Sequence, residues 1–176
     1  MANIVYIATS LDGFIAREDG GIDWLLEYPD PDGGDYGFAG FMARVDCVLM
    51  GRATFESVLG FKEWLYSKPV FVLSNTLKAL PDAVKGKAEL VAGPLAGLLR
   101  DLGARGYKNI YVDGGKTVRS FLDEDLVDEM TITRVPVLLG AGRPLFGSAR
   151  KDLKFEHAGT EVYKNGLVKS RYLRRR

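Results

Sequence analysis

The chain has 176 residues, of which 47% are hydrophobic, and this is enough for one domain with a sizeable core. Its 24 basic and 23 acidic residues nearly cancel, to a formal net charge of +1, so no broad positive field would hold a nucleic acid. The sequence also contains no apolar run of membrane-spanning length. We therefore expect a single domain, residues 1–176, that acts on a small-molecule substrate and binds neither nucleic acid nor a membrane.

The first part of the chain predicts a buried strand followed by a long loop. Residues 4–9 form a short apolar run rich in β-branched residues, which ends at the turn-forming sequence Ser10-Leu11-Asp12-Gly13. Residues 20–40 contain glycines, prolines and acids at irregular spacing, although Trp24-Leu25-Leu26 could form one apolar turn. Long loops in compact domains are usually functional or mobile, so we expect this loop to border a site.

Helices and strands alternate from residue 38 onward. The expected elements are, in chain order, a helix over residues 38–44, a strand over 45–50, a helix over 54–59 that Gly60 closes, strands over 69–73 and 89–91, a helix over 94–102, a strand over 110–112, a helix over 116–124, a strand over 126–135 and a loop over 136–144. In the helix over 94–102 the apolar positions are spaced by three and four residues, and proline occupies the first turn.

The last part of the chain predicts a β-hairpin. Residues 153–162 and 167–173 have strand patterns, and Asn165-Gly166 between them is the strongest short hairpin signal in the chain. The whole pattern predicts an α/β fold in three layers, whose central sheet is mixed, mostly parallel, and antiparallel at its C-terminal hairpin. The strand edges of this hairpin also favour a homodimer.

Two single residues bear on the class of protein. Cys47, the only cysteine, lies inside an apolar run, which predicts a small core residue rather than a nucleophile or a ligand. His157, the only histidine, lies in the expected edge strand and is interpreted as a surface residue. Because the N-terminal residues enter a strand pattern without a basic export signal, we expect a reducing, cytoplasmic location.

Two junctions between a strand and a helix suit a phosphate. At the first junction, Gly51 ends an apolar run, and Arg52 and Thr54 add a guanidinium and a hydroxyl beside the unpaired N–H groups of a helix start. At the second junction, Gly114 and Gly115 would let a ligand approach the backbone closely. Two such places match the pyrophosphate of a dinucleotide, so we expect a nicotinamide cofactor.

Arg52 favours NADPH over NADH, because its guanidinium fork matches the oxygens of a 2′-phosphate. Two structural alternatives stay open: an ordinary strand-to-helix turn with a surface arginine at the first junction, and a simple tight turn at the second. Neither junction has the spaced G-x-G-x-x-G signature of a Rossmann fold, nor an acid at the position that binds an adenosine ribose.

An ordered set of segments resembles the dihydrofolate reductase-like superfamily, and within it the stand-alone proteins similar to the reductase domain of bacterial riboflavin-biosynthesis enzymes. The resemblance covers nearly the whole chain. It implies a central mixed sheet flanked by helices, with the substrate in a cleft beside the nicotinamide. The segments that carry it are residues 8–16, 20–25, 50–56, 72–75, 113–115 and 136–142.

The resemblance implies a role for each matching residue. Ala8 and Ile15 would flank the nicotinamide, and Thr54 would cap the pyrophosphate. Arg52, with Ser74 and Asn75, would meet the 2′-phosphate and the adenine ribose. Trp24 and Phe55 are assigned to the substrate side. The other side of the pyrophosphate would be lined by Gly114, Gly115, Lys116, Thr117 and Val118. A cis peptide between two glycines is common at this junction in dihydrofolate reductases, and the sequence leaves this isomer open.

Hydride transfer to most substrates also needs an acid in the cleft. Asp12 is our first choice, because its turn leaves the first strand at the cofactor end; the alternative is an aspartate that only caps the turn. In true dihydrofolate reductases the acid follows a Pro-Trp pair, whereas Asp23-Trp24 stands here. This departure leaves a folate-type acid unassigned among Glu27, Asp30, Asp32 and Asp35.

One histidine and one cysteine exclude a zinc deaminase signature and a nucleophile–histidine dyad. The sequence therefore predicts an NADPH-dependent reductase of a small heterocyclic substrate, pterin- or pyrimidine-like. One alternative is a 5-amino-6-(5-phosphoribosylamino)uracil reductase of riboflavin biosynthesis, in which Lys62, Lys116 or Arg143 would hold the substrate phosphate. Another is a non-catalytic module that binds a nucleotide on the same fold.

Overall fold

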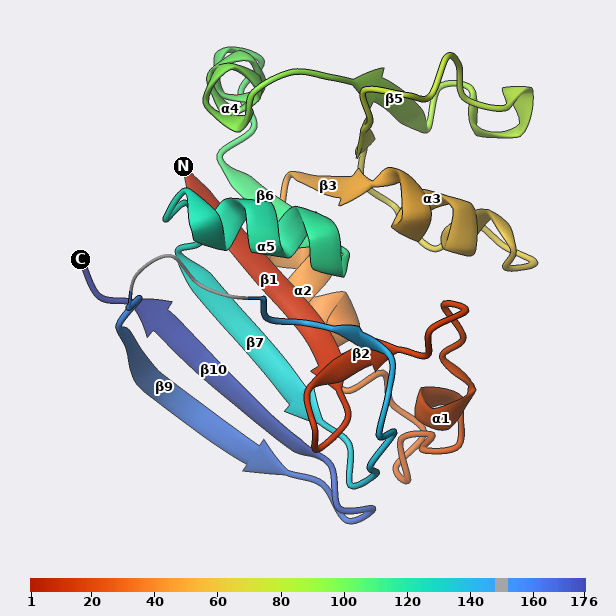
Figure 1. The fold of residues 1–176 in the computed structure, drawn as a ribbon, viewed down its shortest axis with the longest axis vertical. Coiled ribbons are helices and arrows are strands. Elements are labelled where there is room, and N and C mark those ends of the chain that lie inside the picture. The colour runs from red at the N-terminus through yellow and green to blue at the C-terminus, as the bar shows by residue number, and fades with distance from the viewer. Residues whose placement is uncertain (148–151) are drawn as a thin grey trace.

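The computed structural model describes residues 1–147 and 152–176. Eight strands form one sheet: β1 (Ala2–Thr9), β3 (Cys47–Gly51), β4 (Val70–Leu73), β5 (Ala88–Val91), β6 (Asn109–Asp113), β7 (Glu129–Arg134), β9 (Phe155–Val162) and β10 (Val168–Arg174). Their order is β5-β4-β3-β6-β1-β7-β10-β9 (Figure 1). The first six strands in this order are parallel, and β10 and β9 extend the sheet as an antiparallel hairpin.

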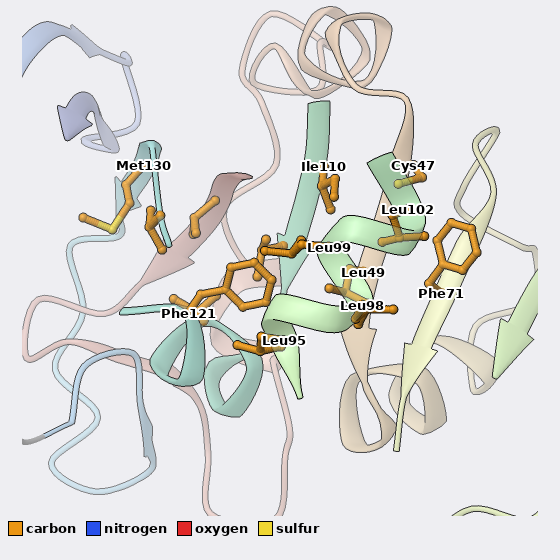
Figure 2. Packing of buried hydrophobic residues seen from close by; sticks show 14 of the residues in the cluster. Cys47, Leu49, Phe71, Leu95, Leu98, Leu99, Leu102, Ile110, Phe121 and Met130 are labelled. Carbon is orange, nitrogen blue, oxygen red and sulfur yellow. The ribbon is translucent and has the colours of Figure 1, made fainter. Parts of the chain in front are cut away.

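The helices lie on both faces of this sheet. They are α1 (Asp23–Leu26), α2 (Phe38–Arg44), α3 (Arg52–Leu59), α4 (Leu95–Ala104) and α5 (Gly115–Asp123), with a short 3-10 helix, η1, at Asp82–Val84. Figure 2 shows how Leu98 and Leu102 of α4 pack on Leu49 and Phe71 of the sheet, with Phe121 of α5 beside them. The opposite face is covered by α2 and α3 through buried side chains such as Phe41 and Phe55.

The sequence of β3 explains why both faces are covered. Successive side chains of a strand point to opposite faces, so Cys47 and Leu49 join the layer of α4 and α5, whereas Val48 and Met50 join the layer of α2 and α3. All four are completely buried, as expected for a parallel strand between two helical layers. The complete burial of Cys47 confirms its interpretation as a core residue, and this burial raises the pKa of its thiol to about 12.

A smaller sheet pairs β2 (Phe14–Ala16) with β8 (Arg143–Pro144). The sequence did not predict these two strands, because three and two residues are too short to show a period. The predicted fold class, three layers with a mixed, mostly parallel sheet and an antiparallel hairpin, is confirmed. Pro94 precedes α4 as its N-cap instead of lying in its first turn.

Two further predictions concern single features. His157 is exposed on the edge strand β9, where its Nε2 lies 2.7 Å from Thr160 Oγ1, so its surface position is confirmed. The peptide bond between Gly114 and Gly115 is trans. Within the described residues, no helix combines the length and the apolar character needed to cross a bilayer.

Candidate cofactor and substrate site

The two predicted phosphate junctions lie side by side at the carboxyl edge of the parallel sheet. Strands β3 and β6 are direct neighbours, and Met50 pairs with Asp113, so Gly51 and Gly114 leave the sheet at the same level. Ligands of open α/β sheets bind outside this edge. The strand order thus unites two segments that are 63 residues apart along the chain.

Each junction glycine is packed against a threonine of the other junction. A Cβ added to Gly51 would lie 2.8 Å from Thr117 Oγ1, and one added to Gly114 would overlap Thr54 Oγ1. Gly114 also has a φ of +89°, which side chains rarely adopt. Both positions therefore require glycine. Thr54 and Thr117 occupy equivalent places, the third residue of α3 and of α5.

The starts of both helices can receive an anion. Gly51 and Gly114 are the N-cap residues of α3 and α5, and neither supplies a side-chain cap to the first N–H groups. Such N–H groups and the positive end of the helix dipole favour phosphate. With the hydroxyls of Thr54 and Thr117 beside them, the two helix starts form a donor-rich edge suited to a pyrophosphate.

The residues expected at the nicotinamide come from β1 and β2. Ile15 of β2 reaches the start of α5, where its Cδ1 lies 2.7 Å from the Cβ position of Gly115. Ala8 of β1 is half-buried and packs on the cluster that contains Trp24 and Val135. Ile15 thus adjoins the second phosphate junction. Ala8 lies near the carboxyl end of β1, the strand that pairs with β6.

The residues expected at the adenine ribose gather after β4. Arg52 Nε donates to Glu56 Oε1 at 2.7 Å, and Arg52 Nη1 lies 3.5 Å from Thr76 Oγ1. Thr76 in turn lies 3.4 Å from Ser74 Oγ. The side chain of Asn75 accepts a hydrogen bond from Gly93 N at 3.2 Å. Thr76 was missed by sequence reasoning, although its position directly after Ser74-Asn75 was a usable signal.

The remaining predicted residues of α5 differ in what they expose. Thr117 is buried against Gly51, and Val118 is completely buried in the core, where its backbone N–H donates to Gly114 O at 2.9 Å. Lys116 is exposed and lines a surface hollow with Arg119 and Ser120. Lys116 is therefore the exposed side chain of this set, and a pyrophosphate contact by the Thr117 hydroxyl stays a prediction.

Asp12 ties two loops together. Its carboxylate accepts hydrogen bonds from Ser10 Oγ at 2.5 Å, from Leu139 N at 3.2 Å and from Gly140 N at 2.7 Å. The hydrogen bond from Ser10, with those from the backbone, lowers the pKa of this exposed carboxyl. An ionised carboxylate with occupied oxygens matches the turn-capping alternative, and its role as the catalytic acid stays a prediction.

Asp113 is a second acid at this edge, to which sequence reasoning gave no role. It is the last residue of β6, and its carboxylate accepts hydrogen bonds from Tyr66 Oη at 2.9 Å and from Gly114 N at 2.8 Å. Desolvation raises its pKa in spite of both hydrogen bonds. An acid between a buried strand and a glycine pair was the available signal.

Trp24 and Phe55, assigned to the substrate side, are both packed in the core, with 2% and 1% of their surfaces exposed. Phe55 contacts Trp64 at a ring-centroid distance of 6.5 Å, and Trp64 contacts Tyr66 at 5.9 Å. This row of rings supports the hydroxyl that reaches Asp113. A direct substrate contact by Trp24 or Phe55 stays a prediction.

The acids of the loop after β2 have structural partners. Asp23 forms an ion pair with Arg17 at 2.7 Å, and Asp32 forms one with Lys164 at 2.7 Å. Asp35 accepts hydrogen bonds from backbone N–H groups at the start of α2, and the bond from Ala39 N is the main cause of its lowered pKa. These three carboxylates hold the loop in place.

Comparison with known proteins agrees with this fold. The RibD C-terminal domain family matches residues 3–169. The uncharacterized protein YwjB of Bacillus subtilis (strain 168) is 37% identical over 164 residues, which cover 91% of each chain. A crystal structure from Shewanella sp. PV-4, whose assignment to riboflavin biosynthesis is itself provisional, is 50% identical over the full length of both chains, with a TM-score of 0.96.

More distant structures share the fold. The deaminase/reductase of Thermotoga maritima, a diaminohydroxyphosphoribosylaminopyrimidine deaminase and 5-amino-6-(5-phosphoribosylamino)uracil reductase, is 17% identical. The match covers 99% of this chain and 56% of that one, with a TM-score of 0.74. Dihydrofolate reductase of Enterococcus faecalis, solved with NADP(H), is 16% identical over 99% of this chain and 97% of that one, with a TM-score of 0.68. The chain has the dihydrofolate reductase-like fold and belongs to the RibD C-terminal domain family.

Proposed function

We propose that this protein is an NADPH-dependent reductase of a small heterocyclic substrate, pterin- or pyrimidine-like. The observation that carries the proposal is the pair of junctions at Gly51 and Gly114, where two uncapped helix starts and two threonine hydroxyls meet at one sheet edge. The membership in a family of reductase domains supports a reductase role.

The residues of the site fit the parts of NADPH. Thr54 and Thr117, with the first N–H groups of their helices, would hold the pyrophosphate. Arg52, Ser74 and Thr76 offer a guanidinium and hydroxyls at the adenosine end. The chemistry that this cofactor supplies when bound is the transfer of a hydride from its nicotinamide ring to an electrophilic carbon.

The chain itself would supply the proton that completes the reduction. A general acid must carry a proton at the working pH, and desolvation moves the pKa of Asp113 in that direction. The pKa of Asp12 moves in the opposite direction. Asp113 is therefore a second candidate for the proton donor beside Asp12, whose carboxylate fixes the loop beyond β7 against the turn after β1.

The second candidate is 5-amino-6-(5-phosphoribosylamino)uracil reductase, which the described activity of the Thermotoga relative favours. That substrate carries a phosphate, which needs basic groups in the cleft. Of the three basic residues considered, Arg143 donates through Nε to Glu18 O at 3.2 Å and packs its guanidinium on Gly20, so it is already engaged. A phosphate on the substrate would therefore rely on Lys62 or Lys116, both of which are exposed.

Cofactor binding tests the proposal first. We expect NADPH to raise the melting temperature more than NADH, by an amount that grows with ligand concentration. Thr54→Val and Thr117→Val should weaken both cofactors, whereas Thr160→Val on the exposed strand β9 is the matched control and should weaken neither.

Turnover is then measured with a panel of pterins and pyrimidines, with and without a ribose phosphate, from the loss of NADPH absorbance. Binding without any turnover would support the non-catalytic nucleotide-binding alternative. The absence of any stabilisation by either cofactor would refute the proposed function.

A further inference from the structure

Arg52, the residue expected to recognise the 2′-phosphate, already holds a carboxylate. Its Nε donates to Glu56 Oε1 at 2.7 Å, one helical turn further along α3. Both side chains are about half exposed, 49% for Arg52 and 50% for Glu56. The ion pair therefore lies at the surface, where an anion from solution can compete for the same guanidinium.

The guanidinium bridges two elements. Nε faces Glu56 on α3, and Nη1 lies 3.5 Å from Thr76 Oγ1 in the turn after β4. A phosphate bound by an arginine usually takes two adjacent N–H groups of the fork. One such edge includes Nε, which Glu56 uses, so a phosphate must either displace Glu56 or bind at the other edge with the carboxylate still nearby.

Both arrangements cost binding energy. Displacement gives up the ion pair, and shared binding leaves the negative Glu56 close to a phosphate with nearly two negative charges. NADH has no 2′-phosphate, so its binding neither breaks the ion pair nor brings a second negative charge close to Glu56. The charge on Glu56 thus acts selectively on the cofactor that carries the extra phosphate.

We propose that Glu56 is a specificity-determining residue, which occupies Arg52 in the free protein and reduces the preference of the site for NADPH over NADH. The inference rests on the proposed function, because it requires the cofactor to place its 2′-phosphate at Arg52. Within this one ion pair, Arg52 would attract the 2′-phosphate and Glu56 would repel it.

The test compares Glu56→Gln with the unchanged protein by calorimetric titration of NADPH, NADH and 2′,5′-ADP. We expect Glu56→Gln to lower the Kd of NADPH and 2′,5′-ADP by about three- to tenfold and to leave that of NADH unchanged. The gain should shrink as salt is raised, because screening weakens the charge on Glu56. Glu89→Gln, which removes another exposed arginine partner on β5, is the matched control and should change no Kd.

A double-mutant cycle shows whether Glu56 acts through Arg52. In the Arg52→Gln background, Glu56→Gln should improve NADPH binding much less than it does in the unchanged protein. An equal gain in both backgrounds, an equal gain for NADH, or no gain at all would overturn the inference while leaving the proposed function intact. Failure of the unchanged protein to bind any of the three ligands would refute both.

Discussion

Tyr66 donates a hydrogen bond to Asp113 at 2.9 Å and joins the segment after α3 to the last residue of β6. Tyr66 is buried, and burial raises its pKa far above the ordinary value, so it stays a neutral donor throughout the working range. A donor favours the ionised form of its partner, so Tyr66 opposes the desolvation that raises the pKa of Asp113. The proton affinity of Asp113 is thus set by two opposing contributions.

Replacement of Tyr66 by Phe should shift the pH profile of turnover. If Asp113 acts as the acid, activity falls as pH rises through its pKa. Tyr66→Phe removes a hydrogen bond that lowers this pKa, so the pKa rises and the falling limb of the profile moves to higher pH. The measurement is kcat against pH for the variant and the unchanged protein. If kcat falls over the same pH range in both, the hydrogen bond from Tyr66 does not act on the acid that controls turnover.

Asp113→Asn should lower kcat by about 100-fold or more, because general acids typically contribute that much.

The same variant should also change the stability of the fold in a pH-dependent way. A carboxyl with a raised folded pKa favours folding below its ordinary value of 3.8, and this contribution is lost as pH rises through the folded pKa. The variant should therefore gain melting temperature relative to the unchanged protein toward neutral pH. A constant difference across the pH range would contradict the raised pKa.

Asp12→Asn should behave in the opposite way. A carboxyl with a lowered folded pKa stabilises the protein above its ordinary value of 3.8, and this stability is lost as pH falls through the folded pKa. The variant should melt at lower temperature at neutral pH and approach the unchanged protein in acid. The kcat of this variant tests whether Asp12 is the catalytic acid, as the sequence predicts. Full turnover would exclude Asp12 from proton transfer, whereas a loss comparable to that of Asp113→Asn would support the prediction.

Gly51→Ala should destabilise the protein by about 1–3 kcal/mol, because the new Cβ would lie 2.8 Å from Thr117 Oγ1. Combining it with Thr117→Ala removes the obstructing atom and should recover part of the loss, as urea denaturation would show. Gly40→Ala in α2 has no neighbour within 4 Å and serves as the control, with an expected gain of up to about 1 kcal/mol. Additive losses in the double variant would argue against the contact.

Leu102→Ala in α4 should cost about 2–5 kcal/mol, since this side chain is 1% exposed within the layer in Figure 2. Leu138→Ala, where the side chain is 70% exposed, should change stability by less than about 0.5 kcal/mol. Denaturant midpoints measured in parallel give both values. Similar losses at the two positions would contradict the assigned core.

The sequence was most informative where local patterns decide the structure. The apolar run that ends at Gly51 and the Asn165-Gly166 turn have short-range causes, and the sequence located both junction glycines, where phosphate binding stays a prediction. Which strands are neighbours has a long-range cause, because β6 pairs with β3 after two intervening strands. The contacts of Thr54 with Gly114 and of Thr117 with Gly51 could not be read from either segment alone.

The two candidate acids illustrate the same limit. Asp12 attracted attention because its turn follows the first strand, but its hydrogen bonds come from Leu139 and Gly140, which are distant in sequence. Asp113 drew no functional assignment, because its raised pKa depends on surroundings that the tertiary fold assembles. Sequence patterns can identify an acid, whereas its protonation depends on neighbours they do not reveal.

The two helix starts at the phosphate edge belong to different layers of the molecule. Phe55 and Val58 anchor α3 on one side of the sheet, and Val118 and Phe121 anchor α5 on the other. The spacing between Thr54 and Thr117 therefore depends on the packing of both layers as well as on the contacts at Gly51 and Gly114. We therefore expect a cavity made deep in either layer to alter the spacing of the two helix starts, even though such a cavity lies far from both threonines.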